Sequence, residues 1–428
     1  MVDRGDIMTP ENKQRIEQIR RGEVPEGYKR TKVGIVPNEW SEDNLGEYLR
    51  EYRKLSNDID RYPVYSSSRQ GLIPQSQYYD KREAVETNLG YKIVPKEYVT
   101  YRHMSDDDIF HFNINDTGTE VLVSSEYPVF TSSPKGNLGY IIPMLNDTAR
   151  FRYFCRTQKL GGTRTRLYYK NLCTYKTSFP PLSEQEKIAE ILSAQDKVIA
   201  LKEKLLEEKK RQKKALMQQL LTGKKRLPGF SDEWHTLILS QVSKKVTIKN
   251  TGFKYNLVFS NSAQNGIVPQ SEQFDKDIAN DENIDKYYVV TEGCFVYNPR
   301  ISVTAPCGPI NVNHNVNTGV MSPLYTVFSV ESDVVDNDYL EQYFKSSVWF
   351  KYMKSVANYG ARHDRMSVTD DDFFNMPITI GNLEEQLAIK HILMGFDGEI
   401  ELLQKVYDRE KQKKKALMQL LLTGIVRA

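Results

Sequence analysis

The stretch "KKALMQQLLTG" (Lys213–Gly223) decides the fold of this chain, because "KKALMQLLLTG" (Lys414–Gly424) repeats it 201 residues further on. The same shift aligns "LSEQEKIAEILSAQD" (Leu182–Asp196) with "LEEQLAIKHILMGFD" (Leu383–Asp397), and the alignment continues without a gap into the first match. A motif that recurs at a fixed shift indicates one structural unit that the chain uses twice.

Each copy predicts one long helix. Ser183 with Glu186 forms an S-x-x-E capping box, and Asn382 with Glu385 gives a similar N-cap signal. Both copies end in a glycine, the residue that most often follows the last helical turn. Forty helical residues would span ~60 Å at the rise of an α-helix.

Apolar side chains recur along both copies with the heptad spacing of a coiled coil. The predicted contact positions are Ile188, Leu192, Ile199, Leu206, Leu216 and Leu220 in the first copy and Ile389, Leu393, Ile400, Leu403, Leu417 and Leu421 in the second. Gly395 and Gly398 are expected to interrupt or bend the second helix. One such helix alone could be an ordinary amphipathic surface helix, but two copies favour antiparallel packing on each other as a rod.

The segments between the helices also repeat, more faintly. The matching stretches are "VPNEW" (Val36–Trp40) with "LPGFSDEW" (Leu227–Trp234), "YSSSRQGLIPQSQYYDK" (Tyr65–Lys81) with "FSNSAQNGIVPQSEQFDK" (Phe259–Lys276), and "LGGTRTRLYY" (Leu160–Tyr169) with "NYGARHDRMS" (Asn358–Ser367). Short β-branched and aromatic runs, broken by Pro, Gly and Asn, fill both segments. They predict two β-rich domains of mixed α and β structure.

The sequence therefore predicts an α+β fold in which two β-rich domains alternate with two long antiparallel helices. The expected parts are an N-terminal helical segment 1–35, a first domain 36–181, a first helical region 182–226, a second domain 227–381 and a second helical region 382–428. In the N-terminal segment Ile16, Ile19 and Gly22 repeat the spacing of Met217, Leu220 and Gly223. We therefore expect a circular, pseudo-two-fold arrangement of the parts.

Composition limits the class of protein. The 428 residues carry 59 Lys+Arg against 56 Asp+Glu, a net charge of +3 that neither requires nor excludes nucleic acid. The four cysteines lie far apart, without metal-ligand spacing, so no disulfide framework and no metal site is expected. A signal peptide and a membrane-spanning stretch are not expected either, and we predict a soluble cytoplasmic protein.

No motif of an enzyme active site stands out. The nucleotide-binding patterns G-x-G-x-x-G and G-x-x-x-x-G-K-[ST] do not occur, nor does the Pro-Pro-aromatic run of an amino-methyltransferase. His363 and Asp364 could exchange protons, but they lie between Arg362 and Arg365, where binding is the simpler role. We expect a chain that binds a ligand and does not transform it.

Duplex DNA is the ligand that these features favour, because two similar domains joined by helices suit a ligand that repeats along its axis. Arginine can fork onto guanine, asparagine can pair with adenine, and serine can reach phosphate. The residues expected near DNA are Ser66, Ser67, Ser68, Arg69, Arg102, Arg164, Arg166, Ser260, Asn261, Ser262, Arg300, Arg362, His363 and Arg365. Each loop alone could be a solvated turn, but recurrence in both domains favours DNA.

At these residues the chain resembles the specificity (S) subunits of Type I restriction–modification systems. The resemblance rests on "PPLSEQEKIAEIL…KKALMQQLLTG" (Pro180–Gly223) and "NLEEQLAIKHIL…KKALMQLLLTG" (Asn382–Gly424), with "VGIVPNEW" and "YSSSRQGLIPQS" in support, and it covers essentially the whole chain. It implies two target-recognition domains, each reading one half of a bipartite DNA sequence, and a helical rod that sets the unread gap. Because the two domains differ over most of their length, we expect an asymmetric target.

The resemblance also implies partners. Two DNA methyltransferase (M) subunits would dock on the helices to give an adenine-methylating complex, and two translocating restriction (R) subunits would complete the restriction complex in a prokaryotic cytoplasm. S-adenosylmethionine, ATP and magnesium would then belong to the partner subunits, and this chain would hold no cofactor.

Two other classes of function stay open at this point. A self-sufficient restriction or modifying enzyme would need a cofactor fold or a metal-binding carboxylate cluster, which the sequence does not contain. A coiled-coil scaffold without DNA reading would explain the helices but not the paired arginine-rich loops. Salt-insensitive or absent DNA association would favour the scaffold, since DNA binding by basic residues weakens with salt.

Overall fold

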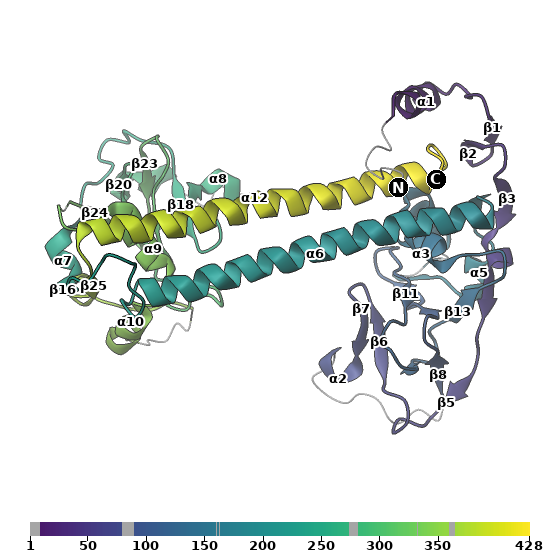
Figure 1. Ribbon diagram of the computed structural model, residues 1–428, viewed down its shortest axis with the longest axis horizontal. Coiled ribbons are helices and arrows are strands. Elements are labelled where there is room, and N and C mark those ends of the chain that lie inside the picture. The colour runs from purple at the N-terminus through teal and green to yellow at the C-terminus, as the bar shows by residue number, and fades with distance from the viewer. Residues whose placement is uncertain are drawn as a thin grey trace. The chain divides into compact units, whose positions relative to one another are not determined.

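The computed structural model describes residues 9–78, 90–159, 161, 163–273, 281–331, 333–358 and 364–428. It divides into two compact units, Met1–Glu203 with Val406–Ala428 and Lys204–Lys405. Each unit contains one β-rich domain and one end of each long helix, α6 (Leu182–Leu220) and α12 (Leu383–Leu421) (Figure 1). The predicted α+β class with two long helices packed together is confirmed.

The first unit carries two antiparallel sheets, with the strand orders β11-β9-β13-β4 and β12-β8-β5, and four separate two-stranded pairs. Its strands are β1 (Tyr28–Thr31), β2 (Gly34–Pro37), β3 (Ser41–Asn44), β4 (Leu49–Glu51), β5 (Leu55–Ser56), β6 (Tyr65–Ser68), β7 (Gly71–Pro74), β8 (Tyr91–Val94), β9 (Val99–Thr100), β10 (Met104–Ser105), β11 (Asn113–Ile114), β12 (Val121–Val123), β13 (Val129–Ser132), β14 (Thr165–Arg166) and β15 (Lys176–Phe179). Its shorter helices are α1 (Pro10–Arg20), η1 (Leu45–Tyr48), α2 (Gln75–Tyr78), α3 (Leu138–Asp147), α4 (Ala149–Thr157) and α5 (Tyr169–Leu172).

The second unit repeats this plan around an antiparallel sheet with the order β17-β24-β21-β22. Its strands are β16 (His235–Ile238), β17 (Ser243–Lys245), β18 (Phe259–Ser262), β19 (Gly266–Pro269), β20 (Tyr288–Val290), β21 (Phe295–Tyr297), β22 (Ile310–Val312), β23 (Gly319–Met321), β24 (Thr326–Val330) and β25 (Pro377–Ile380). Its shorter helices are α7 (Leu239–Val242), α8 (Gln270–Gln273), η2 (Asp281–Lys286), α9 (Asn337–Lys345), α10 (Phe350–Val356) and α11 (Asp370–Phe374).

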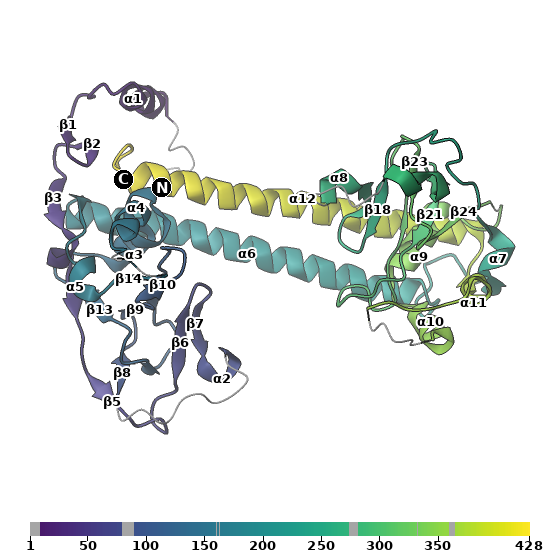
Figure 2. The same cartoon turned by 180° about the vertical axis from the view of Figure 1, so that it is seen from behind.

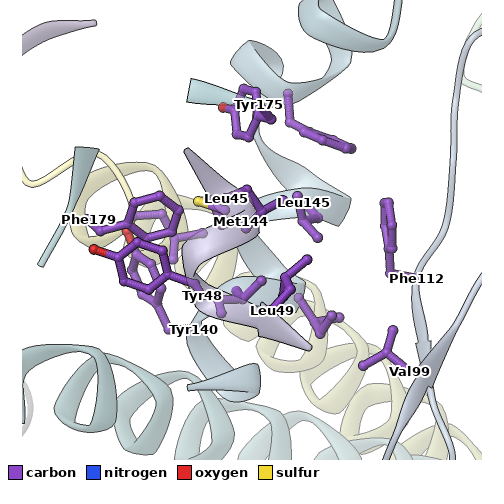
Figure 3. Close-up of a cluster of buried hydrophobic side chains, with 14 of the residues drawn as sticks. Leu45, Tyr48, Leu49, Val99, Phe112, Tyr140, Met144, Leu145, Tyr175 and Phe179 are labelled. Atoms are coloured by element: carbon purple, nitrogen blue, oxygen red, sulfur yellow. The ribbon is translucent and has the colours of Figure 1, made fainter. Parts of the chain in front are cut away.

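Aromatic side chains fill the core of each domain against the start of its long helix. In the first unit Tyr48 stacks on Phe179 with ring centroids 3.8 Å apart, and Tyr140 is fully buried nearby (Figure 3). Ile188 and Leu192 of α6 join the same buried cluster. In the second unit Ile389 and Leu393 of α12 take the equivalent place. The long helices are therefore part of both domain cores.

Within each unit the two long helices lie side by side and antiparallel (Figures 1 and 2). In the first unit Gln195 Nε2 donates to the Glu410 carboxylate at 2.7 Å. In the second unit Lys213 Nζ donates to Asp397 at 2.6 Å. Of the twelve predicted contact positions eight are buried and four are half-buried, the four being Ile199, Leu216, Ile400 and Leu403.

Three local predictions have definite outcomes. The capping box at Ser183 is wrong, because α6 begins at Leu182 and the Pro181 carbonyl accepts from the backbone N–H of Glu184. Asn382 does cap its helix, since its Oδ1 accepts from the Glu385 N–H at 2.9 Å. The expected interruption at Gly395 and Gly398 is also wrong: α12 is continuous over 39 residues, because packing on α6 compensates for the low helix propensity of glycine.

A buried glutamate in the first turn of each long helix holds a tryptophan and an arginine. Glu184 accepts from Trp40 Nε1 at 3.1 Å and from Arg427 Nε and Nη2 at 2.6 and 2.9 Å. In the second unit Glu385 accepts from Trp234 Nε1 at 2.8 Å and from Arg226 Nε and Nη2 at 2.7 and 2.8 Å. We call each set of three side chains a Glu–Trp–Arg clamp.

Each clamp joins the segment that follows one long helix, here called its tail, to the first turn of the other long helix within one unit. The tail turns back at a glycine of positive φ, Gly424 in the first unit and Gly223 in the second. A Cβ at Gly424 would meet Pro37 at 2.7 Å and the Trp40 ring at 3.1 Å, so both conformation and space require glycine. The repeated "LTG" is thus explained by the clamp that follows it.

Replacement of Glu184 by alanine is expected to destabilise the first unit by about 2–3 kcal/mol, because the Trp40 and Arg427 donors would lose their buried partner. Glu186→Ala is the matched control, since Glu186 is exposed in the same helical turn, and it should change stability by less than ~0.5 kcal/mol. Denaturant unfolding of the purified variants measures both. Equal stability of the two variants would contradict this role for Glu184.

Candidate nucleic-acid interface

A hollow of about 380 Å³ lies on the first β-rich domain. The β6–β7 hairpin turn forms one wall with Ser68, Arg69 and Gln70, and the segment from Arg102 to His111 forms the other. Strand β10 in that segment pairs with β14, so that Met104 lies opposite Arg166 and Ser105 opposite Thr165 (Figure 2). The hollow is therefore lined by two segments that are distant in sequence, and β14 pairs with one of them.

An asparagine from strand β11 fastens the hairpin to the sheet. Asn113 Nδ2 donates to Ser67 Oγ at 2.7 Å and to the Ser68 carbonyl at 2.8 Å. The turn itself is closed by Gly71, whose φ of 115° strongly favours glycine. A residue at the tip of this hairpin is therefore presented from a fixed backbone.

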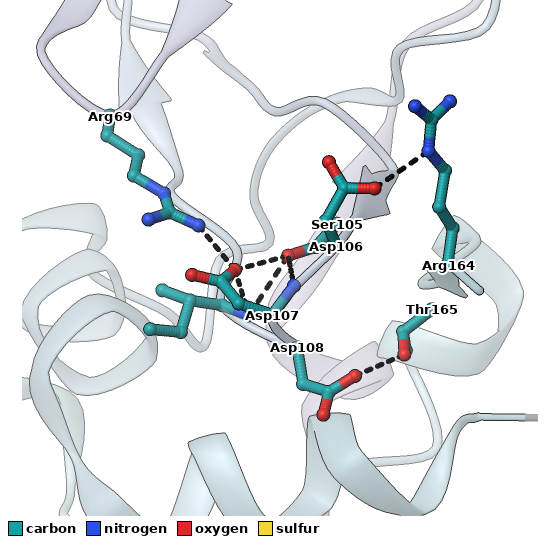
Figure 4. A network of polar contacts seen from close by, with 8 residues as sticks. Arg69, Ser105, Asp106, Asp107, Asp108, Arg164 and Thr165 are labelled. Carbon is teal, nitrogen blue, oxygen red and sulfur yellow. Dashed lines mark hydrogen bonds and ion pairs between the residues drawn. The ribbon is translucent and has the colours of Figure 1, made fainter.

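Three consecutive aspartates beside the hollow each accept a hydrogen bond from another loop, Asp106 from Arg164, Asp107 from Arg69 and Asp108 from Thr165 (Figure 4). Asp107 accepts from Arg69 Nη2 and, at 2.9 Å, from Ser105 Oγ. Asp106 accepts from Arg164 Nε at 2.7 Å. The hydrogen bond from Arg69 is the main reason why the pKa of Asp107 falls to about 2, so this carboxylate is ionised at physiological pH.

The second β-rich domain has a hollow of about 340 Å³ at the corresponding place. Its walls are the β18–β19 turn, with Ala263 and Gln264, and the segment from Asn298 to Thr304. Asn311 Nδ2 donates to Asn261 Oδ1 at 2.6 Å and to the Ser262 carbonyl at 3.1 Å, as Asn113 does in the first domain. The two domains thus share one scaffold around hollows with different linings.

The predicted DNA-contact residues differ in exposure. The side chains of Ser66, Ser67, Ser260 and Asn261 are buried. Ser68, Ser262 and Arg365 are half-buried, and Arg69, Arg102, Arg164, Arg166 and Arg300 are exposed. Arg362 and His363 lie outside the described residues. The first hollow brings together Ser67, Ser68, Arg69 and Arg102, and the second brings together Ser260, Asn261, Ser262, Arg300 and Arg365.

His103 lies beneath the first hollow and is buried. Its ring stacks on Tyr168 with centroids 5.3 Å apart, and burial lowers the pKa of His103. The side chain is therefore neutral at physiological pH and packs as a structural ring.

Sequence reasoning missed Asn113 and Asn311, the side chains that position the two hairpins. A signal existed, because "NIN" (Asn113–Asn115) and "NVN" (Asn311–Asn313) occupy the same place in the two domains. The third residue of each motif also holds backbone: Asn115 Nδ2 donates to the Val94 carbonyl at 2.8 Å and Asn313 Nδ2 to the Thr291 carbonyl at 3.0 Å.

Across the described part of the chain, no group of three or more His, Cys, Asp or Glu side chains is arranged to hold a metal ion. Within the same residues, no helix has the length and apolarity needed to cross a membrane.

The sequence and the fold of this chain both match those of Type I restriction–modification specificity subunits. Residues 50–211 match the family model described as the Type I restriction modification DNA specificity domain. The Type I restriction enzyme MjaVIII specificity subunit of Methanocaldococcus jannaschii is 23% identical over 92% of this chain and 94% of its own length. The MjaX specificity subunit of that organism is 24% identical over 94% of this chain and 97% of its own length. The chain belongs to the Type I restriction–modification specificity subunit family.

Two solved structures share the fold. One is the Type I restriction–modification S subunit from M. genitalium, with a TM-score of 0.53 and 10% identity over 91% of this chain and 96% of the other. Another comes from work on complex assembly and conformational transition of the Type I restriction–modification system, with a TM-score of 0.54 and 14% identity over 91% and 99%. This specificity subunit is a DNA-recognition component, and subunits of this family are not catalytic.

Asn113→Ala in the specificity subunit is expected to loosen the β6–β7 hairpin, because Ser67 Oγ and the Ser68 carbonyl would both lose a donor. Hydrogen–deuterium exchange in residues 65–74 should rise by about tenfold or more. Asn44→Ala serves as the control, because the Asn44 side chain caps no helix. Unchanged exchange in the Asn113 variant would show that the asparagine does not hold the hairpin.

Proposed function

We propose that each β-rich domain of this specificity subunit reads one half of a bipartite DNA sequence, with its hollow facing the duplex. The observation that carries the proposal is the pair of equivalent hollows, each built on the same asparagine-tethered hairpin and each carrying exposed arginine. An exposed arginine on a fixed backbone can fork onto guanine or bind phosphate. The two compact units correspond to the two halves of the target.

The target is asymmetric. The first hollow carries Arg69, Arg102 and Asp106, whereas the second carries Ala263, Asn298 and Ser302. Different donors and acceptors on equivalent walls select different base pairs. The DNA-contact residues proposed for the first half-site are Arg69, Arg102, Arg164 and Arg166 with Ser66, Ser67 and Ser68, and those for the second are Arg300, Arg362, His363 and Arg365 with Ser260, Asn261 and Ser262.

The specificity subunit works on DNA in a prokaryotic cytoplasm and within a complex. Two M subunits dock on the long helices, whose repeated sequence offers two equivalent surfaces, and R subunits join the full restriction complex. S-adenosylmethionine, ATP and magnesium act on those partners. The support is the family match and the fold shared with a chain from a Type I restriction–modification assembly.

The test is a genome-wide methylation map, by long-read sequencing, of cells that express this chain with its neighbouring methyltransferase subunit. A split, asymmetric motif with a methylated adenine in each half, absent without this chain, is the expected result. A stable complex that adds no methylation would favour the alternative function, a coiled-coil scaffold without DNA reading.

Arg166→Ala and Arg365→Ala form a matched pair, because the two residues lie at equivalent places in antiparallel pairings. Arg166 lies opposite Met104 in the first domain, and Arg365 lies opposite Arg300 in the second. Each variant is expected to weaken binding of one half-site by about 5- to 150-fold, the range for loss of one good arginine contact. The affinity of each variant is measured for duplexes that carry base changes in one half-site at a time. Arg156→Ala, at an exposed arginine of α4 outside the hollow, is the control. A uniform effect on both half-sites would refute the assignment of domains to halves.

Removal of one heptad from both long helices is expected to shorten the unread gap by ~3 base pairs, since seven residues span ~10 Å of helix and a base pair rises 3.4 Å. Deleting 202–208 together with 400–406 keeps the contacts between Gln195 and Glu410 and between Lys209 and Glu399. The methylation map of this variant gives the gap directly. An unchanged gap would mean that the helices do not set the spacing.

A further inference from the structure

The hollow of the first domain contains one arginine whose partner is itself anchored. Asp107 accepts from Arg69 and also from Ser105 Oγ and the Ile109 N–H, at 2.9 and 3.4 Å. Ser105 is buried and belongs to strand β10. An unbroken series of contacts therefore runs from the sheet through Ser105 and Asp107 to the Arg69 guanidinium (Figure 4).

The neighbouring pair lacks this support. Asp106 meets Arg164 through a single Nε contact at 2.7 Å, and the described residues show it no second hydrogen bond. The Asp106 side chain is 69% exposed, against 46% for Asp107. Of these two arginine–aspartate pairs in the described residues, Arg69–Asp107 is thus the one whose aspartate is held by a second side chain.

The contact with Asp107 leaves Arg69 able to read a base. It occupies one terminal nitrogen, Nη2, and leaves the Nη1 and Nε donors free of the carboxylate. The Arg69 side chain is 59% exposed at the tip of the hairpin. A free arginine loses much rotamer freedom on binding, whereas one already held by a carboxylate has lost part of that freedom beforehand. The hydrogen bond to Asp107 therefore favours a directed contact of Arg69 through two donors over a contact with phosphate alone.

The hairpin of the second domain has no arginine in its turn. Ser68 pairs with Gly71 and Ser262 with Gly266, so the turn of the second domain is one residue longer and its first residue is Ala263, where the first domain has Arg69.

The segment that corresponds to the aspartates is fixed by backbone hydrogen bonds. His103 accepts from the Leu167 N–H and Pro299 from the Met366 N–H, so the segments that follow His103 and Pro299 are equivalent. Residues 300–307 of the second segment contain no aspartate or glutamate, so the second domain has no counterpart of the Arg69–Asp107 pair.

Val303 in this segment is fully exposed, at 101% of its reference area, and the hairpin turn carries Ala263. Neither aliphatic side chain can donate to guanine O6 and N7, so neither can make the contact that Arg69 can make.

We propose that Arg69, positioned by Asp107, reads one guanine in the half-site of the first domain, and that Asp107 is a specificity-determining residue that acts through Arg69. This inference rests on the proposed DNA-reading function. The second domain has Ala263 in its hairpin turn and no acidic residue in 300–307, so this guanine contact belongs to the first half-site alone.

The test uses the specificity subunit in its complex with the methyltransferase partner, with variants Arg69→Ala, Arg69→Lys and Asp107→Asn. Binding is measured on duplexes that carry each of the four bases at every position of the first half-site, and the methylation map is repeated. Lysine keeps the charge but cannot fork, and asparagine keeps the shape but removes the carboxylate charge. Asp60→Asn, at an exposed turn aspartate of the same domain, controls for loss of one negative charge.

The expected result is loss of a guanine preference of about 5- to 150-fold at one position, in all three variants, with the second half-site unchanged. The double variant Arg69→Ala with Asp107→Val should lose no more than Arg69→Ala alone, because the two residues act as one unit. Asp60→Asn should keep the preference.

Two results would overturn the inference. Retained base choice in Arg69→Lys would mean that Arg69 contacts only phosphate. Tighter binding of every duplex by Asp107→Asn, with unchanged base choice, would mean that Asp107 only repels DNA. Failure of the proposed function looks different, since the unaltered subunit would then direct no methylation. Thermal unfolding of each complex separates these outcomes from misfolding, because loss of fold would weaken both half-sites equally.

Discussion

A buried carboxylate at the start of each long helix is the constraint on which the rest of the structure depends. Glu184 and Glu385 are 5% and 1% exposed, and a buried charge of this kind is tolerated only when it is fully paired. The tryptophan indole and the arginine guanidinium supply that pairing. The tryptophan stands at the start of the β-rich domain and the arginine follows the other long helix, so the glutamate holds these two segments together. The adjacent glutamines complete the joint, since Gln185 and Gln386 each hold the backbone that leads into the domain's own helix.

This joint explains why a short sequence motif can recur while the rest of the chain diverges. The glutamate, the glutamine, the glycine stop and the tryptophan are all buried or sterically confined, so each tolerates little change. The residues at the hairpin tips, such as Arg69 and Ala263, are exposed and do not pack into a hydrophobic core. These residues can therefore differ between the domains, as Arg69 and Ala263 do, without cost to the fold.

Prediction from sequence succeeded where periodicity and repetition carried the signal, and it failed where a partner distant in sequence decided the outcome. Ser183 matches a capping pattern, but the helix already begins at Leu182, where the Pro181 carbonyl accepts the first backbone hydrogen bonds. Gly395 and Gly398 lower helix propensity, yet α12 runs through both because its other face packs on α6. Ser67 and Asn261 suit phosphate contacts by composition, and the local sequence gives no sign of the hydrogen bonds that they accept from asparagines of a different strand.

The two-fold repetition, the long helices, the β-rich class of the domains and the family can all be inferred from the amino-acid sequence, because each follows from local patterns or from motifs that occur twice in the chain. Which arginines share a hollow, and which carboxylate holds which guanidinium, became known from the folded chain. These contacts join separate loops, as Arg164 and Asp106 do across 58 residues. Their geometry comes from strand registers and asparagine tethers, and a linear pattern of residue types does not encode either one directly.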